Sequence, residues 1–135
     1  MKKFQKLVNI TKLLRSKKGC PWDREQTIKS MVEHFSNEAE EVKEAIEKND
    51  HINLKEELGD LLFNILLITQ IAHEEKLFTV DEVLSGIIKK ITTRHTWVFG
   101  KDKAKTTEEA LALWKKNKKT ERNGDEPKKR KILHS

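Results

Sequence analysis

Apolar residues recur every three to four positions along most of the chain, which is the spacing of amphipathic helices. No stretch alternates apolar and polar residues as a half-buried strand does, and only two prolines and five glycines interrupt the pattern. The spacing predicts helices over about 2–16, 27–48, 53–75, 79–97 and 106–118. We therefore expect an all-α fold, a helical bundle of four to five helices.

Polar residues mark the expected ends of these helices. Thr79 begins a capping box, in which a threonine and an acid three residues later bond the first amides of a helix, and Thr106 begins the segment that opens the last helix. Asn53 is the expected N-cap of the third helix. The segment Gly19-Cys20-Pro21-Trp22-Asp23 breaks the chain between the first two helices.

The third helix is apolar on nearly every side from Leu58 to Ile71. A helix with this pattern is buried all round. A chain of 135 residues, 37% of them charged, cannot bury such a helix alone. The pattern predicts that oligomerisation completes the bundle, as a homodimer or a dimer of dimers.

Charge is distributed unevenly along the chain. Basic and acidic residues balance over residues 1–114, so that residues 115–135 carry the whole net charge of +6. The body of the protein is therefore not a basic surface for nucleic acid. We expect one domain over residues 1–118 and a basic, disordered tail over residues 119–135. A solvated tail is favoured over one that binds nucleic acid.

Cysteine content and hydropathy indicate where in the cell the protein is located. With Cys20 as its one cysteine, the chain forms no intramolecular disulfide, which fits a reducing environment. The N-terminal residues lack the continuous apolar stretch of a signal peptide. The longest apolar run, near residues 61–68, is shorter than the roughly 20 residues of a membrane span. We expect a soluble, cytoplasmic protein with no membrane partner.

Two pairs of carboxylates lie on or beside the apolar stripes of the second and third helices. Glu38 and Glu41 are three residues apart, as are Glu57 and Asp60, so each pair shares one helical face. Buried carboxylates must be paired, protonated or bound to metal. Oxygen ligands favour Mg²⁺, Mn²⁺ or Ca²⁺, and the lack of a His or Cys cluster argues against zinc. From spacing alone, solvated surface charge is the simpler interpretation.

Short motifs between Gly19 and Gly100 change that interpretation. In chain order they are Cys20-Pro21-Trp22-Asp23, Glu25-Gln26-Thr27, Glu38-Ala39-Glu40-Glu41-Val42, Glu56-Glu57-Leu58-Gly59-Asp60-Leu61-Leu62, Lys90 to Arg94 with His95, and Val98-Phe99-Gly100. In order and spacing they resemble the MazG-like, all-α nucleoside triphosphate pyrophosphohydrolases. The two acidic pairs look like the family's metal signature. The departures from the family's pattern are Asn37, Glu40, Thr96 and Lys115-Lys116.

The resemblance implies a helical fold that is usually built by dimerisation. It implies Mg²⁺-dependent hydrolysis of an NTP or dNTP between the α- and β-phosphates, giving a nucleoside monophosphate and pyrophosphate in nucleotide-pool housecleaning. Mn²⁺ is a possible substitute for Mg²⁺. By position, the residues that carry over as catalytic metal ligands are Glu38, Glu41, Glu57 and Asp60.

Five residues are candidate contacts to the nucleotide. Lys90 and Arg94, one helical turn apart, match the family's basic pair that contacts the triphosphate. Trp114 and Lys118 look like the family's terminal Trp-x-x-x-Lys, which lies near the substrate. Asn64 either bonds a metal-bound water or a sugar hydroxyl, or is a buried polar group satisfied across a subunit interface.

Several alternatives stay open at this point. The proton of the attacking water goes either to one of the four acids or to a neighbour such as Glu56. The chain is alternatively a nucleotide-binding regulatory module with little turnover, or a narrow-specificity relative acting on dUTP, dCTP or a phosphoribosyl-ATP-like nucleotide. Trp22 is expected as a core anchor rather than a residue that stacks on a base.

Overall fold

The computed structural model describes residues 2–134, with side chains described through Glu121. This part of the chain is helical and contains no strand, so the predicted all-α fold is confirmed. The helices in chain order are α1 (Lys2–Leu14), α2 (Pro21–Glu25), α3 (Met31–Glu47), α4 (His51–Glu74), α5 (Val80–Arg94), α6 (Thr96–Phe99) and α7 (Thr107–His134).

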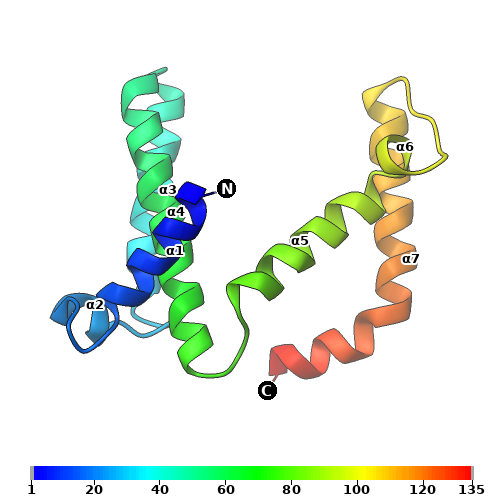
Figure 1. The fold of residues 1–135 in the computed structure, drawn as a ribbon. Helices are drawn as coiled ribbons and strands as arrows, with labels where there is room; N and C mark the ends of the chain where they lie inside the picture. The colour runs from blue at the N-terminus through cyan, green and yellow to red at the C-terminus, as the bar shows by residue number, and fades with distance from the viewer. Residues whose placement is uncertain (1, 135) are drawn as a thin grey trace. The chain divides into compact units, whose positions relative to one another are not determined.

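The chain forms two compact units, residues 1–82 and residues 83–135. In the first unit α3 and α4 pack along each other as an antiparallel pair, and α1 packs on α4 (Figure 1). The centre of this unit is a buried cluster of Met31, Leu67 and Ile71. In the second unit α6 packs on α7. The predicted boundary at residue 118 stays a prediction.

A short turn joins α3 to α4. Asn49 follows the C-cap residue Lys48 and has a φ of 54°, the left-handed conformation that asparagine tolerates at the end of a helix. Asp50 is the N-cap of α4, and its side chain accepts a hydrogen bond from the Asn53 amide at 3.1 Å. The expectation that Asn53 caps this helix is wrong, because Asp50 takes that role three residues earlier.

The predicted capping box at Thr79 and the predicted helix start at Thr106 are confirmed. The Thr79 hydroxyl accepts from the Glu82 amide at 3.2 Å, and the Thr106 hydroxyl accepts from the Glu109 amide at 3.1 Å. The fourth predicted helix ends at Arg94 rather than near residue 97, because α6 is a separate helix.

The last helix, α7, continues beyond the predicted end at residue 118. The predicted tail, residues 119–135, lies mostly outside the residues whose side chains are described, so its disorder stays a prediction.

The segment expected to break the chain overlaps the short helix α2. Pro21 stands at its N-terminal end, where the missing amide hydrogen of proline costs nothing. The chain turns tightly just before it, since the Cys20 amide donates to the Leu14 carbonyl at 2.9 Å. A Cβ on Gly19 would overlap the carbonyl oxygens of Leu13 and Leu14. Only glycine therefore fits this close approach.

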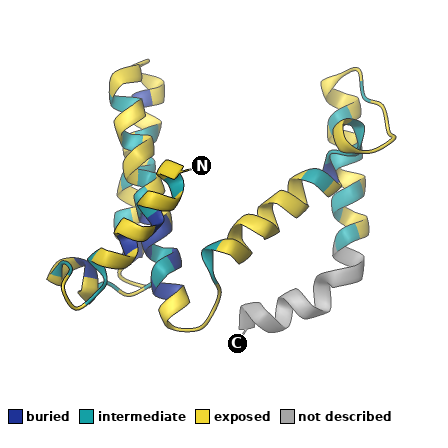
Figure 2. Cartoon of the chain, in the orientation of Figure 1, coloured by how far each residue is buried: buried dark blue, intermediate teal, exposed yellow. Residues whose placement is uncertain are grey.

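Helices α4 and α5 each leave several apolar side chains in solvent in the single chain. On α4, one face carries buried residues such as Leu67, while Leu58, Leu62 and Ile65 are exposed. On α5 the exposed apolar stripe consists of Val83, Leu84, Ile87, Ile88 and Ile91. Figure 2 shows α5 exposed along most of its length. No helix in the described part of the chain is long and apolar enough to cross a membrane.

Candidate functional site

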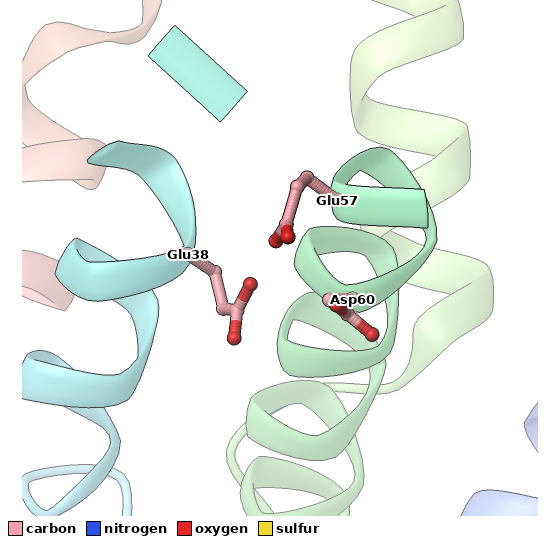
Figure 3. Close-up of side chains that lie close together, drawn as sticks. All are labelled: Glu38, Glu57 and Asp60. Atoms are coloured by element: carbon pink, nitrogen blue, oxygen red, sulfur yellow. The ribbon is translucent and has the colours of Figure 1, made fainter. Parts of the chain in front are cut away.

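Three of the four expected metal ligands come together on the α3–α4 pair. Glu38 extends from α3, and Glu57 and Asp60 extend from adjacent turns of α4 (Figure 3). One carboxylate oxygen from each lies within 4.8 Å of the other two. Oxygen ligands around a Mg²⁺ or Ca²⁺ ion bind at about 2.0–2.6 Å, so the three oxygens can share one ion after small side-chain movements.

Glu41 is not part of this close group. It lies one turn further along α3 and is exposed. The negative charge of Glu41 nevertheless acts on the cluster, because it helps to raise the pKa of Glu57. The structure therefore brings together three predicted ligands and leaves Glu41 at the edge of the cluster.

The cluster carries negative charge without a basic partner. Partial burial, a hydrogen bond with Glu38 and the charges of the nearby acids raise the pKa of Glu57 to about 7. Oxygen Oε2 of Glu38 is buried and has no hydrogen-bond partner. The ion pairs among the described residues, Arg15–Glu74, Lys43–Glu47 and Arg94–Glu121, do not involve the cluster. An unpaired buried oxygen beside two more carboxylates fits a hard divalent cation.

A cavity of about 250 Å³ adjoins the carboxylates. Its lining residues are Trp22, His34, Glu38, Asp60, Phe63 and Asn64. Trp22 meets the His34 ring edge-to-face, with 5.1 Å between ring centroids. The expectation that Trp22 is a core anchor is wrong, because α2 leaves it 48% exposed at the cavity.

Asn64 is buried and lines the same cavity. Its side-chain amide donates to the His34 carbonyl at 3.5 Å, a long hydrogen bond. This contact lies within one chain, so Asn64 needs no second subunit for that bond. The amide therefore remains placed to contact a ligand in the cavity.

Three predicted nucleotide contacts meet in the second unit. The Arg94 guanidinium lies over the Trp114 ring, 5.2 Å from its centroid, and the Lys118 ammonium lies 5.1 Å from the same centroid. Arg94 is buried, and its Nε donates to Glu121 at 3.2 Å. Lys90, one turn before Arg94 on α5, is exposed. The structure thus gives Arg94 a protein partner that the sequence did not indicate.

Asn117 also holds this group together and was not predicted. Its side-chain amide donates to the Arg94 carbonyl and to the Thr96 hydroxyl, both at 3.0 Å. Asn117 and Glu121 follow Trp114 by three and seven positions, the spacing of one helical face. That spacing was the available signal, but it lies inside a Lys-rich stretch where polar residues are common.

Comparison with known proteins identifies the family of this chain. The profile described as "MazG nucleotide pyrophosphohydrolase domain" matches residues 26–99, more than half of the 135 residues. The chain belongs to this MazG family. The matched range includes the three clustered carboxylates and both members of the Lys90–Arg94 pair.

Individual relatives agree with the family match. The chain is 41% identical over 126 residues to the "Nucleoside triphosphate pyrophosphohydrolase/pyrophosphatase MazG" of Thermotoga maritima, covering 90% of this chain and 49% of the relative. It is 37% identical over 123 residues to the "Nucleoside triphosphate pyrophosphohydrolase" of Escherichia coli K12, covering 90% of this chain and 47% of the relative. It is 40% identical to "Uncharacterized protein YabN" of Bacillus subtilis, covering 91% of this chain and 25% of that protein.

The chain therefore spans a quarter to a half of the length of these curated relatives. A solved structure, "Crystal structure of mazG-related protein from Thermotoga maritima", matches it with a TM-score of 0.72 and 36% identity. That match covers 85% of this chain and 98% of the solved chain. It supports the same all-helical fold for most of this chain.

Proposed function

We propose that this MazG-family chain is a Mg²⁺-dependent nucleoside triphosphate pyrophosphohydrolase. It would cleave an NTP or dNTP between the α- and β-phosphates to a nucleoside monophosphate and pyrophosphate. The observation that carries the proposal is the group of Glu38, Glu57 and Asp60, which have unmatched charge beside a cavity. The names of the Thermotoga and Escherichia relatives support it.

In this proposal, Glu38, Glu57 and Asp60 hold Mg²⁺, and Glu41 completes the ligand set from the next turn of α3. Mn²⁺ would bind the same oxygens. The metal supplies charge neutralisation of phosphate oxygens and a lowered pKa for bound water. The chain's own contribution is to keep three carboxylates converged despite their repulsion, and so to preorganise the place where the phosphates bind.

The cavity beside the carboxylates is the proposed place for the nucleoside. Trp22 and His34 offer aromatic surface to a base, and the Asn64 amide offers a polar contact. A nucleotide whose phosphates meet the carboxylates would extend its sugar and base into this space. The lining does not by itself select one base, so the range of substrates is left to the assay below.

The basic residues of the second unit are proposed contacts to the triphosphate. Lys90 is exposed and Lys118 is partly exposed, so both can meet phosphate oxygens directly. The Arg94 side chain is only 6% exposed and is paired with Glu121. Arg94 would therefore exchange part of that pairing for phosphate, with Trp114 guiding the guanidinium plane.

We further propose that a second copy of the chain covers the exposed apolar faces of α4 and α5, as a homodimer or dimer of dimers. The stripe on α5 and the exposed face of α4 support this, since contiguous apolar patches mark interaction surfaces. A cytoplasmic location and a role in clearing surplus or non-standard nucleotides are consistent with the proposed reaction.

The deciding experiment is a panel of NTPs and dNTPs with Mg²⁺, in which the products are identified. We expect nucleoside monophosphate and pyrophosphate from the wild-type chain. Asp60→Asn and Glu41→Gln should lower kcat/KM, Asp60→Asn by roughly 100- to 10,000-fold, because a metal supplies several kcal/mol to the transition state. Glu40→Gln, an exposed acid on α3, is the matched control.

The same panel separates the alternatives. Release of orthophosphate instead of pyrophosphate, or equal rates for wild type and Asp60→Asn, would contradict the proposal. Tight binding of Mg²⁺-nucleotide by calorimetry with no turnover would indicate a regulatory binding module. Turnover of a single nucleotide would indicate a narrow-specificity enzyme.

A further inference from the structure

One arginine holds the short helix that brings Trp22 to the cavity. Arg15 follows α1, and its Nη1 donates to three carbonyl oxygens, those of Asp23, Arg24 and Gln26, at 2.6, 3.1 and 2.8 Å. These carbonyls lie at the C-terminal end of α2, where the backbone acceptors are only partly satisfied and a cation is favourable. The position of α2 therefore depends on where the Arg15 guanidinium lies.

The rest of that guanidinium is fixed by α4. Its Nε and Nη2 donate to the two carboxylate oxygens of Glu74 at 3.1 and 2.6 Å, a bidentate pair. Gln70 donates to the same carboxylate at 3.3 Å, and the Arg15 side chain is only 10% exposed. One planar group thus ties α2 to α4, the helix that carries Glu57 and Asp60.

We propose that Arg15, oriented by Glu74, is a positioning residue that sets the Trp22 wall of the cavity and thereby the affinity for the nucleoside part of the substrate. The inference rests on the proposed function for the identity of the ligand. Arg15 is not among the residues that line the cavity or form the carboxylate cluster, and it donates hydrogen bonds to α2 and Glu74, so it acts through α2. A lysine keeps the charge but cannot span three carbonyls and a carboxylate, because it lacks the planar fork.

Two ligands separate positioning of the nucleoside from damage to the phosphate site. ATP has phosphates and a nucleoside, whereas inorganic tripolyphosphate has phosphates only. For Arg15→Lys we expect KM for ATP to rise about tenfold, since stacking on an aromatic residue contributes about 1–3 kcal/mol per base. kcat and the inhibition constant of Mg²⁺-tripolyphosphate should be unchanged. Arg24→Lys is the matched control, because the Arg24 side chain is exposed and donates a single hydrogen bond among the described residues, to the Lys17 carbonyl.

A double-mutant cycle tests whether Arg15 acts through Trp22. In the Trp22→Ala background, Arg15→Lys should have no further effect on KM, because the indole ring that Arg15 positions is absent. Glu74→Gln should raise KM in the same direction as Arg15→Lys. Multiplicative effects of Arg15→Lys and Trp22→Ala, or weaker tripolyphosphate inhibition in Arg15→Lys, would overturn the proposal and assign Arg15 a general structural role.

Amide hydrogen exchange provides a measurement that needs no activity. In Arg15→Lys we expect faster exchange over residues 20–27, with α3 unchanged, because a lysine cannot make the set of hydrogen bonds that holds α2. If wild-type protein neither binds nor hydrolyses any nucleotide of the NTP and dNTP panel, the proposed function fails, while hydrogen exchange still tests whether Arg15 holds α2. Unchanged exchange over residues 20–27 would show that Arg15 does not hold α2, and the inference would be wrong.

Discussion

The two units of the chain differ in which of their side chains lack a partner. In residues 1–82, apolar side chains form a core, but Glu38 and its neighbours carry negative charge with no basic partner among the described residues. In residues 83–121, the buried residue is Arg94, which is paired with Glu121, while α5 exposes an apolar stripe. The first unit therefore has unpaired negative charge, and the second has exposed apolar side chains.

Unpaired charge and exposed apolar surface are satisfied by different partners. A small ion can bind and leave with substrate, and it raises the free energy of unfolding by an amount that depends on its concentration. An apolar stripe is covered only by another protein surface, which stays in place. In the proposed function, ligand binding is therefore assigned chiefly to the α3–α4 pair, and assembly is assigned chiefly to α5 and the exposed face of α4.

The largest expected effect is on assembly. Ile88 is 60% exposed in the single chain, so Ile88→Glu would be tolerated by a monomer. In a dimer that buries the α5 stripe, an unpaired charge costs about 3–5 kcal/mol, and association should weaken by roughly 100-fold or more. Sedimentation velocity measures this, with Ser85→Glu, outside the stripe, as control. Identical sedimentation of Ile88→Glu and wild type would remove α5 from the interface.

The next two predictions make the same chemical change in each unit and expect opposite signs. Glu121→Gln should destabilise the second unit by about 1–3 kcal/mol, because it leaves the buried Arg94 without its ionic partner. Urea unfolding followed by tryptophan fluorescence suits this test, since Trp97 and Trp114 both lie in that unit. The exposed Glu108→Gln is the control. No change in the urea midpoint would mean that the Arg94–Glu121 pair contributes nothing.

Glu38→Gln should stabilise the first unit when no divalent metal is present. It removes one of the mutually repelling carboxylates, and we expect Tm to rise by about 1–3 °C. With Mg²⁺ present, the variant should lose the Tm gain that the ion gives to wild type. Thermal melts with Mg²⁺ and with chelator measure both effects, and Glu44→Gln on α3 is the control. A lower Tm in chelator would show that Glu38 is not under repulsive strain.

The smallest expected effect is on how stability changes at acidic pH. Arg15 lowers the pKa of Glu74 from its usual 4.5, so the ionised pair adds stability above about pH 4.5. That contribution is lost as the pH falls through the lowered pKa. The difference in urea midpoint between wild type and Glu74→Gln should be constant from pH 7 to about pH 5 and shrink toward pH 3. A difference that grows on acidification would contradict this linkage.

Local features of the fold were predictable from sequence, whereas long-range contacts were not. Helical spacing and the hydroxyls of Thr79 and Thr106 predict helices and their starts, because each signal acts within one turn. Asn53 was chosen wrongly because Asp50, three residues earlier, is an equally good cap. Arg15 and Glu74 are 59 positions apart, and no periodicity connects them.

The candidate site shows the same division. Spacing placed Glu57 beside Asp60 on one helical face, and the short turn before α4 made an antiparallel partner with Glu38 a reasonable expectation. Spacing did not show that Glu41 stays outside the close group, because that depends on the side-chain geometry of the packed helices. The placement of Trp22 at the cavity depends on α2, which the sequence pattern presented as a break.

The turn at Asn49 has a consequence for how the protein folds. Because a short turn joins α3 to α4, the contacts next to the turn are local in sequence, and local contacts favour fast folding. The carboxylates would then meet while the chain is still collapsing, and their repulsion would slow that step. A divalent ion present at that stage would reduce this repulsion and speed folding, so the ion proposed for the chemistry would also lower the barrier to forming the α3–α4 pair.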